Sequence, residues 1–306
     1  MKKQILKIGI SPILVLFLIS FMLPDASAQA IIKNKDNSGP RDIDIITVNT
    51  WVYLEGALTN VQIPENYVLP MRSHLNRVRM LPGQSFVNFS GDTIYMPPGQ
   101  PYNMAPWFYY GNEGEAYDSN GDPDPGTAGY PMSAVDWVLV SLRLTPDGEP
   151  VCRKAGLLHD DGHVEFPGGG FDCEGLDELG TCYIVIQHRN HLMVMSAAAV
   201  PVIRGKVTFD FRNSQSYIND PFLSGSVGQK ELTPNLPGAF SMYAGNGCQA
   251  GCAYSDHDIN LDDRDCWELV NRTMGYRPGD YNMNGDCNFN DRLIWEANNG
   301  MFTSVP

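Results

Sequence analysis

The sequence predicts a mainly β protein, an antiparallel β-sandwich followed by a small α-helical domain. Three observations support this fold class. The 306 residues include 30 glycines and 22 prolines, a content that is typical of strand-rich folds with many turns. Short segments rich in β-branched and aromatic residues recur between turn residues. Over the last 66 residues this pattern stops, and ten acidic residues, four arginines and no lysine follow.

The overall charge excludes one class of partner. The chain has 35 acidic and 21 basic residues, a formal net charge of -14 at pH 7. A protein that neutralises a phosphate backbone needs a basic face, and this composition provides none. We therefore expect no nucleic-acid partner, and we expect cations to be favoured.

The first residues resemble a secretory signal. Lys2, Lys3 and Lys7 accompany an apolar run over residues 8–23, and Ala26-Ser27-Ala28 has the small-x-small pattern of a cleavage site. We predict a signal peptide over 1–28, a secreted protein and no membrane span after cleavage. The alternative is an uncleaved membrane anchor. Residues 29–44 are polar and predict a flexible leader.

The β-sandwich is predicted over residues 45–240. Its expected strands lie within residues 45–58, 135–144, 183–194 and 207–211. In the segment 135–143 both alternating sets of side chains are largely apolar, which predicts a central strand covered on each face. Asp160-Asp161-Gly162 predicts a hairpin turn between Leu158 and Val164.

Seven cysteines lie after the predicted cleavage site. Secretion permits disulfides, and the odd number leaves at least one thiol without an intramolecular partner. Their connectivity stays open. A zinc site is disfavoured, because Cys248 and Cys252 lack a second pair of ligands at suitable spacing.

The most specific motif lies near the end of the chain. Oxygen-bearing side chains occupy positions 1, 3, 5, 9 and 12 of a twelve-residue loop with Gly at position 6; the expected ligand residues are Asp280, Asn282, Asn284, Asp286 through its backbone carbonyl, Asn288 and Asp291. Calcium prefers six to eight oxygens, and such loops wrap the ion. Two carboxylates predict a Kd on the order of 10⁻⁵ to 10⁻³ M. The alternative is an Asn/Asp-rich turn without an ion.

A repeat predicts a second, weaker loop. The pattern Asn260-x-x-Asp263-Arg264-x-x-Trp267 recurs 28 residues later as Asn288-x-x-Asp291-Arg292-x-x-Trp295. An insertion that carries the cysteines displaces the first ligand, and His257 replaces the expected Gly. The expected ligands of this first loop are Asn246, Asp256, Asp258, Asn260 and Asp263.

The paired loops resemble the dockerin-like, EF-hand-related calcium repeats of secreted bacterial proteins. Further segments resemble a secreted and surface module of Bacteroidota: Leu54-Glu55-Gly56-Ala57, Gln100-Pro101-Tyr102-Asn103, residues 135–140, residues 188–197 and Ser304-Val305-Pro306. The resemblance implies that a β-rich region precedes a dockerin-like domain over residues 241–306. It implies calcium and an extracellular or cell-surface location more than a reaction.

Other candidate chemistry is weaker. On one strand, His188 and His191 would point to opposite faces, so we expect no metal site there. Asp136 and Glu165 are the carboxylates that a hydrolase could use, although no known catalytic motif surrounds them. Trp107 and Tyr109 are possible sugar contacts, but core packing is the commoner fate of such residues.

These observations predict a non-enzymatic, calcium-binding structural or interaction protein for cell-surface adhesion, extracellular matrix or filament assembly. Its expected partners are calcium, a second copy, another surface protein or a glycan. A carbohydrate-binding or dockerin-type scaffolding component of a polysaccharide-degrading system is the alternative. A glycoside hydrolase-like enzyme is the third possibility.

Overall fold

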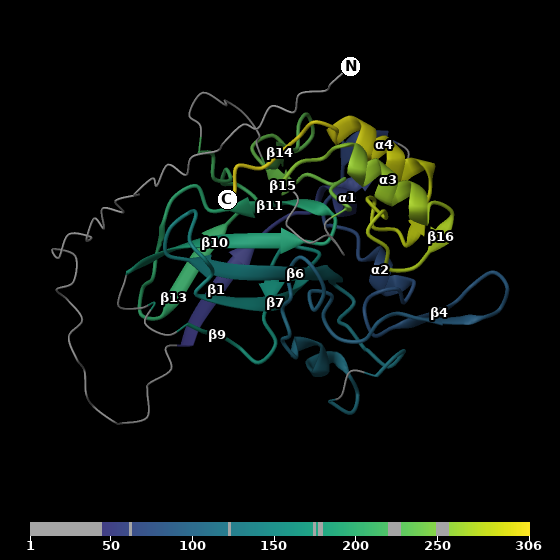
Figure 1. The fold of residues 1–306 in the computed structure, drawn as a ribbon, viewed down its shortest axis with the longest axis horizontal. Helices are drawn as coiled ribbons and strands as arrows, with labels where there is room; N and C mark the ends of the chain where they lie inside the picture. The colour runs from purple at the N-terminus through teal and green to yellow at the C-terminus, as the bar shows by residue number, and fades with distance from the viewer. Residues whose placement is uncertain are drawn as a thin grey trace, which may run out of the picture. The chain divides into compact units, whose positions relative to one another are not determined.

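The structure is a computed structural model, and it describes residues 45–306 except 61–62, 122–123, 174–175, 177–179, 220–227 and 249–256 (Figure 1). Residues Ile43–Pro306 form one compact unit. The predicted signal peptide and leader lie outside the described residues. Within the described ranges, no helix has the length and apolar character needed to cross a bilayer.

The largest sheet has six strands and is built around β6 (Ala134–Arg143). Its order is β11 (His191–Met195), β10 (Thr181–His188), β6, β7 (Cys152–His159) and β8 (Val164–Glu165), with β12 (Val200–Pro201) also paired to β10. Nine of the ten residues of β6 are buried, because both sheet faces are covered. The prediction of a central strand here is confirmed, as is the hairpin turn between Leu158 and Val164.

A three-stranded sheet completes the β core, with the order β13 (Lys206–Asp210), β1 (Ile45–Trp51) and β9 (Phe171–Asp172). Val48, Val207 and Phe171 from this sheet belong to the same hydrophobic core as the apolar residues of β6. The mainly β, sandwich-type prediction is therefore confirmed. It is wrong in one respect, because β1 and β13 run parallel.

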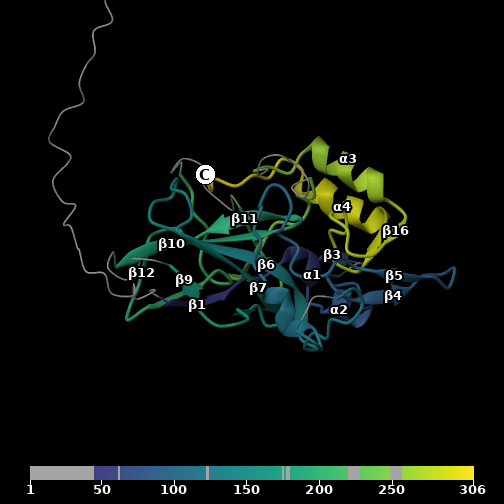
Figure 2. The same ribbon diagram turned by 60° about the horizontal axis from the view of Figure 1, so that its bottom comes forward.

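Short elements connect these sheets. The structure has α1 (Glu55–Leu58), α2 (His74–Arg77) and the 3₁₀ helix η1 (Glu113–Tyr117), and paired strands β2 (Thr59–Asn60) with β3 (Ile63–Tyr67), β4 (Ser85–Val87) with β5 (Thr93–Tyr95), and β14 (Gln229–Glu231) with β15 (Phe240–Met242). The strand expected over 45–58 thus ends at Trp51, and α1 follows. Figure 2 shows the β4–β5 hairpin extending beyond the neighbouring elements.

The C-terminal region contains two ten-residue helices, α3 (Leu261–Val270) and α4 (Phe289–Asn298), which lie side by side (Figure 1). Both begin with a capping box, at Asn260 and Asn288, where the next acidic residue accepts the backbone N–H of the cap. The predicted helix after position 12 of the second loop is confirmed. Between the helices, β16 (Thr273–Met274) pairs with β17 (Asp286–Cys287).

The two repeats contact each other reciprocally. The indole N–H of Trp267 donates to the carbonyl of Asn288 at 2.9 Å, and that of Trp295 donates to the carbonyl of Asn260 at 2.7 Å. The 28-residue spacing in the sequence thus becomes an approximate twofold relation in the structure. Each helix is anchored on the cap of the other, so neither repeat is complete alone.

One cystine is defined in the described part of the chain. Cys152 on β7 is joined to Cys173, which directly follows β9, so the disulfide links strands of the two larger sheets. Cys182 and Cys287 are buried and carry no disulfide. Cys252 lies outside the described residues.

Candidate calcium loops and the polar cluster beside them

The second loop brings its first, third and twelfth residues together in the interior. Asp280, Asn282 and Asp291 are fully buried. The carboxylate oxygens of Asp280 accept the backbone N–H groups of Asn284 and Gly285, at 2.9 and 2.8 Å. Those of Asp291 accept the N–H groups of Asn282 and Asn288, at 3.0 and 2.8 Å. These bonds fold the loop around two carboxylates.

The other predicted ligands lie nearer the surface. Asn284 and Asn288 are half-buried, and the side chain of Asp286 is exposed. The amide of Asn288 donates to the Asp286 carboxylate at 3.0 Å. Gly285 has φ +79°, and a Cβ there would lie 2.3 Å from the sulfur of Met80. Gly is therefore required at position 6 by both conformation and space.

The electrostatics of the loop favour a cation. Burial raises the pKa of Asp280, although the charge of Arg189 opposes this, and burial followed by the charge of Asp280 raises the pKa of Asp291. Two desolvated carboxylates disfavour each other's ionised form unless positive charge lies between them. Hard carboxylate and amide oxygens are the donors that calcium prefers. The residues of loop two therefore fit the ion.

The donor set is a mixed one. Within the described ranges, no group of three or more His, Cys, Asp or Glu side chains is arranged to hold a metal ion. Loop two contributes two buried carboxylates, with amide oxygens and a backbone carbonyl expected to complete the set. The calcium assignment thus depends on the neutral oxygens as much as on the acids.

The first loop has the same hydrogen bonds around its twelfth residue. Asp263 is buried and accepts the N–H groups of Cys248 and Asn260, both at 2.9 Å. Cys248 thus occupies the place that Asn282 has in loop two, and the buried Asn246 occupies that of Asp280. An amide at position 1 leaves Asp263 as the only buried acid among the described ligands.

The remaining residues of loop one are spread out. Asn260 is half-buried and caps α3, and Asp258 is exposed. Asp258 also forms a bridge with Phe302, which corresponds by 28 residues to the pairing of Met274 with Asp286 in loop two. Asp256 lies outside the described residues. The smaller buried charge agrees with the expectation of a weaker site.

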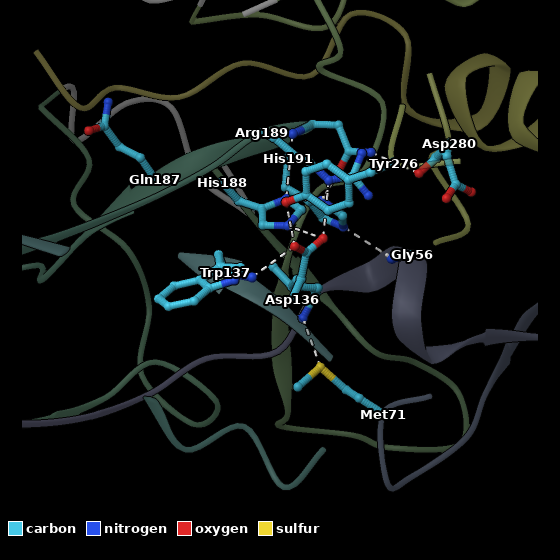
Figure 3. Close-up of polar contacts among 12 residues, drawn as sticks. Gly56, Met71, Asp136, Trp137, Gln187, His188, Arg189, His191, Tyr276 and Asp280 are labelled. Carbon is cyan, nitrogen blue, oxygen red and sulfur yellow. Dashed lines mark hydrogen bonds and ion pairs between the residues drawn. The ribbon is translucent and has the colours of Figure 1, made fainter. Parts of the chain in front are cut away.

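A buried polar cluster lies next to loop two (Figure 3). Asp136, in the middle of the apolar strand β6, accepts hydrogen bonds from the backbone N–H of Trp137 at 2.8 Å, Tyr276 Oη at 2.6 Å, His188 Nε2 at 3.2 Å and Arg189 Nε at 3.1 Å. Burial opposes ionisation, but the charge of Arg189 and these hydrogen bonds lower the pKa of Asp136. Asp136 is therefore a buried anion with its countercharge in place.

His188 and His191 converge, contrary to the sequence expectation. They face each other across the β10–β11 hairpin rather than lying on one strand, and their ring centroids are 4.7 Å apart. His191 Nε2 accepts the backbone N–H of Gly56 at 3.2 Å. Burial lowers the pKa of both rings. Neutral imidazoles with Nε2–H on His188 and Nδ1–H on His191 satisfy these contacts, so the pair fits a structural role.

The turn of this hairpin contacts both calcium loops. Asn190 Nδ2 donates to the carbonyl of Asp280 at 2.8 Å, and the carbonyl of Asn190 accepts the N–H of Asn246 at 3.2 Å. Those are the first residues of the two loops. Arg189 donates through Nη1 to the carbonyl of Arg277, and its guanidinium lies 4.2 Å from the ring centroid of Tyr276. One two-residue turn thus joins the β core to both repeats.

Arg72 provides a second contact between the β core and loop two. Its Nη2 donates to the carbonyls of Gly56 and Asn282, both at 2.7 Å. Gly56 packs so closely that a Cβ there would lie 2.0 Å from the carbonyl oxygen of Tyr281. The backbone of loop two is therefore held on two sides by the β core.

The two predicted sugar contacts are not surface platforms. Trp107 is 3% exposed and packs edge-on against Tyr102, with ring centroids 5.0 Å apart. It lines a cavity of about 250 Å³ together with Arg189 and Tyr276. Tyr109 is half-buried, and its hydroxyl donates to Glu113.

The two carboxylates considered for a hydrolase do not converge. Trp137, Leu157 and Glu165 are cross-strand neighbours in register, whereas Asp136 is in the adjacent row with Leu158. Side chains in adjacent rows point to opposite faces of a sheet. Asp136 and Glu165 therefore lie on opposite faces of the six-stranded sheet.

Sequence reasoning missed Arg72, Arg189, Asn190 and Tyr276, which attach the loops to the β core. One signal was present, because an acid inside an apolar strand, as at Asp136, needs a buried partner. Nothing in the sequence identified that partner, since Arg189 and Tyr276 are 87 residues apart.

Comparison with known proteins gives little further guidance. No family model matches the chain, and no curated protein matches it. Two similar solved structures are type II cohesin–X-dockerin complexes from Acetivibrio cellulolyticus, with mutations in the N-terminal and the C-terminal interface respectively. They are 19% and 18% identical, and the matches cover 55% and 54% of this chain and 83% of each matched chain, with a TM-score of 0.32 in both. The resemblance to dockerin-like repeats stays a prediction.

Proposed function

We propose that this protein is a secreted, calcium-binding structural or interaction protein for cell-surface adhesion, matrix or filament assembly. One observation carries the proposal: the loop with the calcium-type donor set is also the loop that the β core holds. Asn190 bonds to the carbonyl of Asp280, and Arg72 bonds to that of Asn282. An ion in loop two would therefore order the contact between the β core and the C-terminal repeats.

The chain's own residues explain how calcium would act. Asp280 and Asp291 supply charge, Asn282 and Asn284 supply amide oxygens, and Asp286 supplies its carbonyl. Because the donors converge only in the folded loop, calcium binds the native state and stabilises it by mass action. Extracellular calcium concentrations suit the moderate affinity expected of two carboxylates.

An exposed apolar hairpin supports the interaction role. Phe89, in the turn between β4 and β5, is 96% exposed, and Val87 and Tyr95 on the two strands are also exposed. Figure 1 shows this hairpin projecting at the side of the molecule next to the loop region. Contiguous exposed apolar side chains on a soluble protein commonly mark contacts with other proteins.

Light scattering on the mature protein, with calcium and with a chelator, tests the assembly role. We expect larger species with calcium, and we expect Phe89→Ser to abolish them while it leaves the melting temperature unchanged, since that side chain has almost no contacts to lose. A monomer under both conditions contradicts assembly. Saturable binding on a glycan array, lost in Tyr109→Ala, would support the carbohydrate-binding alternative instead.

A further inference from the structure

A hydrogen-bonded Ser–His–Glu trio lies at one end of the six-stranded sheet, outside the calcium loops and the polar cluster. Ser133 Oγ lies 2.8 Å from His159 Nδ1, and His159 Nε2 lies 2.8 Å from Glu165 Oε2. Ser133 precedes β6, His159 ends β7 and Glu165 is on β8. The pairing of Ala134 with His159 and of Leu157 with Glu165 brings them together.

The two contacts of His159 define one consistent protonation state. Glu165 accepts the proton on Nε2, which leaves the lone pair on Nδ1 facing the hydroxyl of Ser133. A nucleophile within hydrogen-bond reach of a base, with the base oriented by a third group, is the diagnostic geometry of nucleophilic catalysis. The common serine hydrolase arrangement uses the two ring nitrogens in the reverse order, but the roles are the same.

We infer that Ser133, His159 and Glu165 form a nucleophilic site that hydrolyses short-chain acyl esters. This activity is independent of the calcium-dependent role proposed above.

The trio is accessible to a substrate. The side chains of His159 and Glu165 are 15% and 47% exposed, and the adjacent Met132 is 74% exposed. The backbone N–H of Ser133 donates to no other residue in the described part of the chain, so it is available to an oxyanion, as a nucleophile's own N–H is in other serine hydrolases.

The surroundings indicate the kind of ester. The ring of His163 stacks beside His159, with centroids 6.2 Å apart, and the ring of Trp51 lies 5.6 Å beyond it. Such rings favour a flat alcohol part, and the open position of Ser133 favours a short acyl group. The inferred substrate class is an acetyl ester of an aryl or sugar-like alcohol.

The reaction balances with water as the only co-reactant. Ser133 Oγ bonds to the carbonyl carbon and gives its proton to His159 Nδ1, and the carbonyl electron pair moves to oxygen. The ester C–O bond then breaks, and the leaving alcohol takes the proton from His159. Water repeats both steps on the acyl-serine, releases the carboxylic acid and restores the hydroxyl of Ser133.

Two measurements on the mature protein test the inference: hydrolysis of p-nitrophenyl acetate and labelling by a fluorophosphonate, with the labelled peptide identified by mass spectrometry. Ser133→Ala keeps all the histidines, so it controls for non-specific imidazole catalysis. We expect its rate to be about 10² times lower or less, the usual minimum contribution of general-base catalysis. Glu165→Gln should lose at least about tenfold, because the amide no longer fixes the tautomer of His159.

Ser90→Ala changes an exposed serine on the β4–β5 turn and should leave hydrolysis and labelling unchanged. The fluorophosphonate should label the peptide containing Ser133 in the wild type. Equal hydrolysis by the wild type and Ser133→Ala, or labelling at another serine alone, overturns the inference. Absence of both activities in folded protein also overturns it, and the trio is then a structural hydrogen-bond network.

Discussion

Asp291→Asn is the sharpest perturbation of the proposed calcium site. The change keeps the size of a fully buried side chain but removes one of the two acids of loop two. It also places an amide where a carboxylate oxygen accepts a backbone N–H, from Asn282 or Asn288. That second cost applies with and without calcium. The informative quantity is therefore the calcium-dependent change in melting temperature for each variant.

The magnitude follows from mass action. At 10 mM calcium, a Kd between about 10⁻⁵ and 10⁻³ M stabilises the native state by roughly 1.4 to 4 kcal/mol. For a unit of this size, one kcal/mol moves the melting temperature by about 2 to 4 °C. The wild type should therefore gain about 3 to 16 °C. Loss of one partner of a buried charge interaction costs about 3 kcal/mol, or about a hundredfold in Kd.

Differential scanning fluorimetry on mature protein, in calcium and in chelator, measures this gain. We expect Asp291→Asn to retain less than about half of the wild-type gain, whereas Asp147→Asn, an exposed change outside the loops, should retain all of it. Asp263→Asn reports on loop one and should have the smaller effect. Equal gains in all four proteins would refute the calcium assignment. An equal loss in all variants would show that the effect is not specific to loop two.

Further predictions concern the contacts around the loops. Trp295→Phe removes the indole N–H that bonds to the carbonyl of Asn260 at 2.7 Å, and urea titration should show a loss of about 1 kcal/mol, whereas an unchanged midpoint would contradict reciprocal anchoring. Asp136→Asn leaves the buried Arg189 without its countercharge, so urea unfolding should show a loss of about 3 kcal/mol or more, and a loss below about 1 kcal/mol would contradict the buried ion pair. Because burial raises the pKa of Asp280, the calcium-free native state binds protons that the unfolded chain has released, and its stability falls as pH rises above the ordinary carboxyl range of about 4. Calcium requires the ionised form, so the calcium-dependent gain should be larger at pH 8 than at pH 5, and a gain that falls with pH would contradict the assignment.

Local patterns in the sequence predicted local structure well. Two apolar faces predicted the buried central strand β6, and Asp160-Asp161-Gly162 predicted the β7–β8 hairpin. The repeat predicted equivalent helix starts, which the structure has at Asn260 and Asn288. These features succeed because each depends on residues within a few positions of one another.

Features that depend on distant residues were missed. Residues 183–194 were expected to be one strand, because Arg189-Asn190 lacks the glycine of a typical hairpin turn. The turn is instead held by contacts with Asp136, Asp280 and Arg277, which come from other parts of the chain. The trio of Ser133, His159 and Glu165 was missed for a similar reason, since only strand register brings it together.

Calcium content measures the central claim most directly. Mature protein dialysed to equilibrium against micromolar to millimolar calcium, then analysed by elemental mass spectrometry, should bind at least one ion per chain with a Kd between about 10⁻⁵ and 10⁻³ M. The same measurement on Asp280→Ala should lose that ion while circular dichroism shows a folded β protein. Stoichiometric calcium retained by Asp280→Ala, or none bound by the wild type at 10 mM, would contradict the account.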